Sequence, residues 1–151
     1  MRSISIRKTF DMAFREKRAW VSLVAWIVPF TAYFALVPAA PAEASGEILR
    51  RLGWFAAATL SYGMLLGIGI ALIAAHTPRN ERGKPDERDR VIELRATSWA
   101  YGVMLTGMIV VGIVYPFEQS GWAITNAALF TIVAAEVVRE IVTVIAYRRG
   151  A

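Results

Sequence analysis

The 151-residue sequence contains no cysteine, and its only histidine is His76. The lack of cysteine excludes disulfides, thiolate metal sites and a cysteine nucleophile. A single imidazole also argues against a multi-histidine metal or haem site within one chain. Because neither a metal set nor a nucleophile–base pair is visible, we expect no cofactor and no enzymatic activity.

Charged residues are also scarce, at 19% of the chain, and they cluster between long apolar runs. The hydrophobic fraction is 56%, above the roughly 45–50% of soluble globular proteins. A helix needs about 20 apolar residues to cross the hydrocarbon core of a bilayer. Four segments meet this requirement, at about residues 19–37, 52–75, 96–115 and 122–147. We therefore predict an all-α membrane protein in which residues 19–147 form one antiparallel bundle of four transmembrane helices.

The distribution of lysine and arginine predicts how these helices are oriented. Fourteen of the seventeen lie in residues 1–18, 76–95 and 148–151, two are Arg50 and Arg51, and Arg139 lies within the fourth segment. Because basic flanks stay in the cytoplasm, we expect both termini and the 76–95 loop on that side of a bacterial-type inner membrane. The net charge of +5 does not indicate a nucleic-acid partner, since the basic residues flank apolar segments and form no single patch.

The N-terminal residues 1–18 allow two interpretations. Phe10, Ala13 and Phe14 fall on one helical face beside basic residues, which predicts an amphipathic helix lying on the inner leaflet against anionic lipid headgroups. Alternatively, this leader, the first apolar run and the small residues at 38–44 resemble a cleavable secretory signal. Cleavage would leave three spans.

The fourth segment carries Glu136, Arg139 and Glu140, which share one helical face. Ionisable residues inside a span suggest a functional site by default, because charge is costly to bury in lipid. Glu136 could titrate in a proton or cation site. The structural alternative is that Arg139 neutralises the carboxylates and the set faces other helices.

A second candidate is the segment 86–95, which reads as a helix that continues without a breaker into the third span. Asp86 can cap this helix, and Glu87 suits its positive end. We consider Asp86, Glu87, Arg88 and Arg95 a candidate cytoplasmic docking motif. A solvated helix held by local pairs is the alternative, as is pairing of Arg88, Glu93 or Arg95 with the base of the fourth helix.

Glycines recur in the middle spans at Gly63 and Gly67, and at Gly102, Gly107 and Gly112. Small residues let helices approach closely. We expect them to serve packing within the bundle, with a dimer interface as the alternative.

The Asp86-Glu87-Arg88 triplet, Ile92 and the Arg95-Ala96 pair resemble a motif of uncharacterised small bacterial and archaeal four-span membrane proteins, in which it precedes the third span. The final Tyr147-Arg-Arg-Gly150 is also similar. The resemblance covers about the second half of the chain. It implies a shared device at the cytoplasmic face and no particular activity.

These features favour a non-enzymatic membrane protein that acts by binding, as an accessory or regulatory subunit or as a homo-oligomer. The alternative is a small proton- or cation-coupled transporter or channel that uses Glu136.

Overall fold

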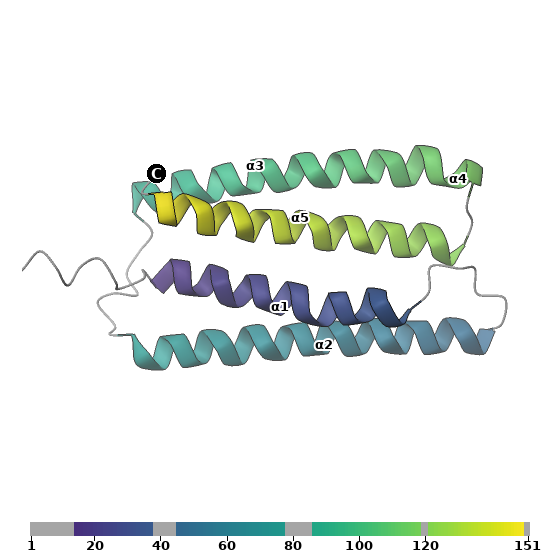
Figure 1. Cartoon of the computed structure of the whole chain (residues 1–151), viewed down its shortest axis with the longest axis horizontal. Coiled ribbons are helices and arrows are strands. Elements are labelled where there is room, and N and C mark those ends of the chain that lie inside the picture. Colours follow the sequence, from purple (N-terminus) through teal and green to yellow (C-terminus); the bar gives the residue numbers. More distant parts are fainter. Residues whose placement is uncertain (1–13, 38–44, 78–85, 119–120, 150–151) are drawn as a thin grey trace, which may run out of the picture.

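The computed structural model describes residues 14–37, 45–77, 86–118 and 121–149, and within these ranges the regular structure is entirely helical. Four long rods run side by side (Figure 1). Most of the N-terminal segment, the 38–44 and 78–85 connections and Gly150 lie outside the described residues, so the predictions made for them are not tested.

The first hairpin consists of α1 (Phe14–Leu36) and α2 (Ser45–His76). Residues 14–18, predicted as part of a separate interfacial helix, instead begin α1 without a break. Pro29 lies inside α1, where it removes one backbone hydrogen bond, yet the helix continues to Leu36. Burial of Pro29 and its neighbour Phe30 in the fold helps to maintain the helix through this point.

The charged segment and the third apolar run form one rod, as predicted. Here α3 (Glu87–Ile109) passes through the π-helical η3 (Val110–Val114) into α4 (Tyr115–Glu118). Asp86 is its N-cap, and Asp89 completes a capping box. The π turn ends two residues before Pro116, whose missing N–H interrupts the regular hydrogen-bond series.

The last helix, α5 (Trp122–Arg149), follows a turn in which Gly121 has a φ of 57°. This left-handed conformation is readily available only to glycine, so Gly121 permits the sharp reversal after α4.

Three helices are long and apolar enough to cross a membrane: Phe14–Leu36, Gly46–His76 and Glu87–Phe117. The fourth predicted span coincides with α5, which carries Glu136, Arg139 and Glu140 along its length. The structure therefore supports a helical membrane protein with three candidate spans, and the fourth remains a prediction.

The helices are ordered α3–α5–α1–α2, with α5 and α1 in the middle and α2 and α3 at the edges (Figure 1). Neighbours in this row are antiparallel. The beginning of α1, the end of α2, the beginning of α3 and the end of α5 meet at one end, called here the basic end because it adjoins the segments rich in lysine and arginine.

An aromatic core joins α1, α2 and α5 in the other half of the molecule. Phe30 and Tyr33 are buried with Trp122, and the ring of Trp26 lies 4.3 Å from that of Tyr62. The other aromatic and aliphatic members of this core are Phe34, Val37, Phe55, Ala58, Leu129 and Val133. This packing fixes α1 between its two neighbours.

Two glycines allow close approach between helices. A Cβ atom on Gly107 of α3 would overlap Thr131 of α5, and one on Gly69 of α2 would overlap Val21 of α1. The predicted packing role thus applies to Gly107, whereas a Cβ on Gly63, Gly67, Gly102 or Gly112 would meet no atom within 4 Å.

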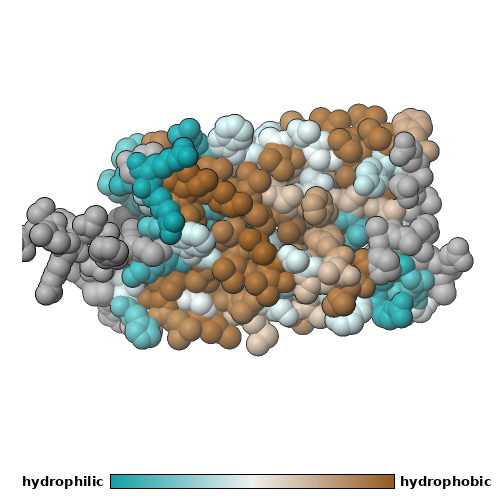
Figure 2. Space-filling view, in the orientation of Figure 1, coloured by the Kyte–Doolittle hydropathy of each residue, from teal (hydrophilic) through white to brown (hydrophobic). Residues whose placement is uncertain are grey.

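The outer surface is largely apolar. Figure 2 shows hydrophobic residues across the middle of one face and hydrophilic residues gathered toward the ends. Large apolar side chains are exposed along both edge helices, among them Leu60, Met64 and Ile68 on α2. A bilayer would solvate such a surface, whereas water would not.

Candidate functional site

A polar cavity of about 380 Å³ lies between the four helices, in the half of the molecule toward the basic end. This volume is within the range of small-molecule sites, which is roughly 300–1,000 Å³. Residues from α1, α2, α3 and α5 all line it. Three cationic and three anionic side chains contribute to the wall: Arg15, Arg18, Arg139, Asp89, Glu93 and Glu140.

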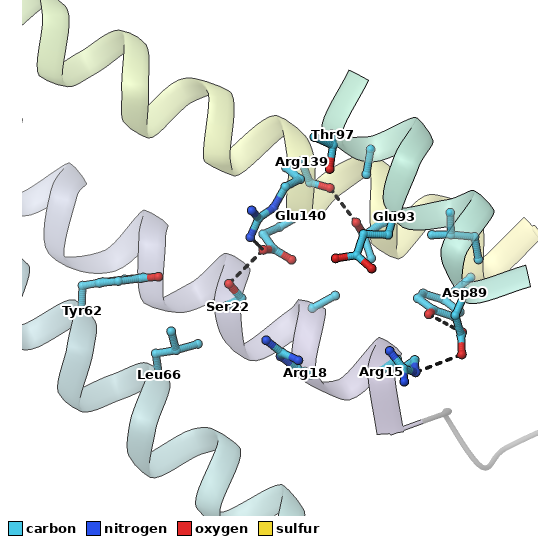
Figure 3. A pocket seen from close by; sticks show the side chains of 15 residues that line it. Arg15, Arg18, Ser22, Tyr62, Leu66, Asp89, Glu93, Thr97, Arg139 and Glu140 are labelled. Carbon is cyan, nitrogen blue, oxygen red and sulfur yellow. Dashed lines mark hydrogen bonds and ion pairs between the residues drawn. The ribbon is translucent and has the colours of Figure 1, made fainter. Parts of the chain in front are cut away.

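The deepest charge in the cavity is Glu140 of α5, which is only 6% exposed. Ser22 of α1 donates a hydrogen bond of 3.0 Å to its Oε1, and Arg139 binds the same oxygen at 3.0 Å. Figure 3 shows Ser22 facing Glu140 and Arg139 across the space between α1 and α5. The buried carboxylate is thus satisfied by a hydroxyl and a cation, as burial of a charge requires.

Arg139 also binds Glu136, with 3.3 Å between Nη2 and Oε2. One guanidinium therefore holds both carboxylates of α5, and the predicted cluster of Glu136, Arg139 and Glu140 does assemble. Glu136 itself does not line the cavity, whereas Arg139 and Glu140 do. The geometry agrees with neutralisation by Arg139, and the cavity adds a surface that the sequence alone did not indicate.

The rim of the cavity is held by Asp89 of α3. The Tyr147 hydroxyl of α5 donates a 2.6 Å hydrogen bond to Asp89 Oδ1, and Arg15 Nε of α1 lies 2.9 Å from Oδ2. One carboxylate thus connects three helices. Tyr147 is seven residues after Glu140, so the rim and the buried carboxylate are separated by about 10 Å along α5.

Four residues of this site were not predicted from the sequence: Arg15, Ser22, Asp89 and Tyr147. Tyr147 was named only as part of the C-terminal similarity, and Asp89 is one acidic residue among several near the start of α3. The sequence does set Ser22 apart, because it is the first polar residue in the mostly apolar run that follows the basic leader. Its partner could not be predicted, since Glu140 lies 118 residues away.

Removing the Tyr147 hydroxyl tests the rim. We expect Tyr147→Phe to lower the free energy of unfolding by about 1.5 kcal/mol, because a hydrogen bond to a charged group is lost and the phenyl ring keeps its packing. Unfolding in mixed detergent micelles measures the change. Tyr115→Phe is the matched control and should be neutral, since no hydrogen bond of its hydroxyl occurs among the described residues. Equal effects of the two changes would contradict the assignment.

A second link between α1 and α5 lies beside the rim. Arg148 binds Glu16 at 3.5 Å and lies over the Trp20 ring, 5.1 Å from its centroid. Arg148 was expected only as a topogenic charge. Its contacts show that it also fastens the end of α5 to the beginning of α1.

The candidate docking motif lies outside the wall of this cavity. Asp86, Glu87, Arg88 and Arg95 are all exposed, and none of them lines the cavity. Asp86 accepts a 2.7 Å hydrogen bond from the backbone N–H of Glu87, as a cap. Of the three residues considered for pairing with the base of α5, Glu93 lines the same cavity as Arg139 and Glu140.

A separate buried charge lies at the opposite end of the molecule. Arg51 is 3% exposed, forms an i,i+4 pair with Glu47, and lies over Trp122 with 5.7 Å from its guanidinium carbon to the ring centroid. It therefore links α2 to α5 inside the protein, although the sequence suggested only a flanking charge.

His76 lies at the end of α2, where its Nδ1 is 2.8 Å from the Leu72 carbonyl oxygen of the same helix. Across the described ranges, no group of three histidine, aspartate or glutamate side chains is arranged to hold a metal ion.

Comparison of the chain with protein-family models, curated proteins and solved structures finds no match.

Proposed function

We propose that this protein is a non-enzymatic, four-span membrane protein that acts by binding a polar group in the cavity at its basic end. In this proposal it serves as an accessory or regulatory subunit of the membrane, or as a self-associating one. The observation that carries the proposal is the cavity itself, since all four helices line it and a buried carboxylate lies within it.

The orientation rests on the positive-inside bias, which places the basic end and both termini in the cytoplasm. The position of α5 supports its inclusion as the fourth span. It lies between α1 and α3, and its buried charge faces α1. A polar face directed at other helices is the usual solution for charged residues within a membrane.

Photo-crosslinking from the cavity wall tests the binding role. A benzophenone amino acid at Thr97, which lines the cavity, is compared with one at the neighbouring Ser98, which is exposed but does not. Irradiation in native membranes should give a discrete adduct at position 97 that position 98 lacks. Identical adducts at the two positions would contradict a selective occupant.

The second candidate is a proton- or cation-coupled transporter. The specific observation in its favour is that Glu136, Arg139 and Glu140 follow one face of α5 and lead into the cavity. Along this helix Glu136 is eleven residues from Tyr147, which corresponds to about 16 Å of depth.

Reconstitution into liposomes containing a pH-sensitive dye separates this alternative from pure binding. If Glu136 carries protons, Glu136→Gln should reduce proton flux at least about tenfold, because the amide cannot titrate. Glu87→Gln is the matched control, since Glu87 is exposed and distant from the cavity wall. Absence of flux in the unmodified protein would remove the transporter alternative.

A further inference from the structure

Two of the six charges in the cavity wall differ from the others. Asp89 is bound by Arg15 and Tyr147, and Glu140 is bound by Arg139. Arg18 of α1 and Glu93 of α3, in contrast, have no hydrogen-bond or ion-pair partner within the described ranges, and both are exposed. Figure 3 shows them on different helices that border the cavity. The site thus offers one available cation and one available anion.

We propose that the cavity binds the headgroup of a phospholipid that carries a phosphate and a primary ammonium group, as in phosphatidylethanolamine. Arg18 would bind the phosphate, and Glu93 would accept hydrogen bonds from the ammonium. This inference rests on the proposed binding function and specifies the ligand. The charges of the wall cancel, three against three, so the site favours a ligand with two separated opposite charges over one with a net charge.

The Glu93 carboxylate determines which zwitterionic headgroup the cavity prefers. A carboxylate accepts short, charge-assisted hydrogen bonds from an N–H donor, and a primary ammonium offers three of them. A trimethylammonium group offers none. The hydroxyl of Thr97 in the same wall adds further hydrogen-bonding capacity, and that of Thr143, which donates to the Arg139 carbonyl oxygen, can still accept a hydrogen bond. The guanidinium of Arg18 suits phosphate, which it can bind through two parallel hydrogen bonds.

The position of the cavity favours an intact lipid over a free headgroup compound as its ligand. The walls include residues of both edge helices, α2 and α3, which lie on opposite sides of the α1–α5 pair. The cavity is partly open, and helices on both sides of that pair contribute to its wall. Leu66 lines the cavity on α2, and the exposed Leu65, Ile68 and Leu72 extend an apolar surface along the same helix. Acyl chains could cover that surface while the headgroup enters the cavity.

Native mass spectrometry of the purified full chain tests this assignment, because lipids are identified by their mass. The protein is titrated with dioleoyl lipids that carry ethanolamine, choline or glycerol headgroups, and separately with O-phosphorylethanolamine. The ethanolamine lipid should bind at least about tenfold more tightly than the other three ligands, because only it satisfies both charges and provides acyl chains.

Four variants make the test specific. Arg18→Gln and Glu93→Gln should each weaken binding of the ethanolamine lipid about tenfold, while Arg90→Gln and Glu87→Gln, exposed changes of the same type outside the cavity, should not. Arg18 and Glu93 have no partner among the described residues. Their glutamine variants should therefore keep the melting temperature of the unmodified protein.

Equal binding of the three lipids, insensitivity to Arg18→Gln and Glu93→Gln, or binding of O-phosphorylethanolamine as tight as that of the lipid would each overturn the inference. These outcomes differ from failure of the proposed function. A selective Thr97 adduct of another chemical class would leave a binding role intact and remove only the phospholipid. Identical adducts at Thr97 and Ser98 would remove both.

Discussion

Replacing Arg139 with methionine is expected to lower the free energy of unfolding by about 3 kcal/mol. The change removes the cation that binds both Glu136 and Glu140, and it keeps most of the apolar volume of the side chain. Among the described residues, Ser22 would then be the remaining partner of the Glu140 carboxylate, which is 6% exposed. Loss of the cation is costly because the buried Glu140 carboxylate stays desolvated without it.

Unfolding in mixed detergent micelles measures this loss, and two further variants identify its origin. Arg149→Met lies on the same helix at an exposed position and should change stability by no more than about 0.5 kcal/mol. Combining Arg139→Met with Glu140→Gln should cost less than the sum of the single changes, because the neutral amide no longer needs a cation. Strict additivity would contradict the pairing.

The second large effect is expected at Gly107. An alanine there should destabilise the protein by about 2 kcal/mol, because its Cβ would overlap the Thr131 side chain and force α3 away from α5. At an open helical position, replacing glycine with alanine usually raises the free energy of unfolding, because alanine restricts the unfolded chain more than glycine does. The clash must therefore exceed this gain for the variant to lose stability.

Gly102→Ala and Gly112→Ala are the matched controls on the same rod, because a Cβ at either position meets no atom within 4 Å. Both should be neutral or stabilising by up to about 1 kcal/mol. Thr131→Ala should partly rescue Gly107→Ala by removing the overlapping atoms. If all three glycine variants behave alike, the close approach of α3 to α5 is wrong.

Local sequence patterns were enough to predict the helices. Apolar runs of about 20 residues gave the rods, and Asp86 followed by a charged, unbroken segment predicted the continuous α3. The i,i+4 spacing of Glu47 and Arg51 is enough to account for their pair, and that of Glu136 and Glu140 places both carboxylates within reach of Arg139. Each of these contacts lies within one helix, so its geometry follows from residue spacing.

The cavity could not be predicted in this way, because residues far apart in the chain form it. Asp89 and Tyr147 are 58 residues apart, and neither spacing nor composition indicates that α3 packs on α5 at that height. The order α3–α5–α1–α2 likewise depends on side-chain fit, such as that between Gly107 and Thr131. Arg51 illustrates the same limit, since its burial against Trp122 depends on the approach of another helix.

We expect the polar cavity between the four helices to be hydrated and to reach well into the membrane. Leu66 lines this cavity on α2, ten residues or about 15 Å from His76, whereas the adjacent Leu65 is on the exposed apolar surface. Because the natural sequence has no cysteine, Leu66→Cys and Leu65→Cys each introduce a single thiol.

The decisive measurement is the rate at which a charged methanethiosulfonate, present on both sides of phosphatidylcholine vesicles, labels these two thiols. A thiol reacts as its thiolate, which requires water. We predict rapid labelling at position 66 and labelling at least about tenfold slower at position 65, where lipid surrounds the side chain. Equal rates, or no labelling at position 66, would contradict the existence of the cavity.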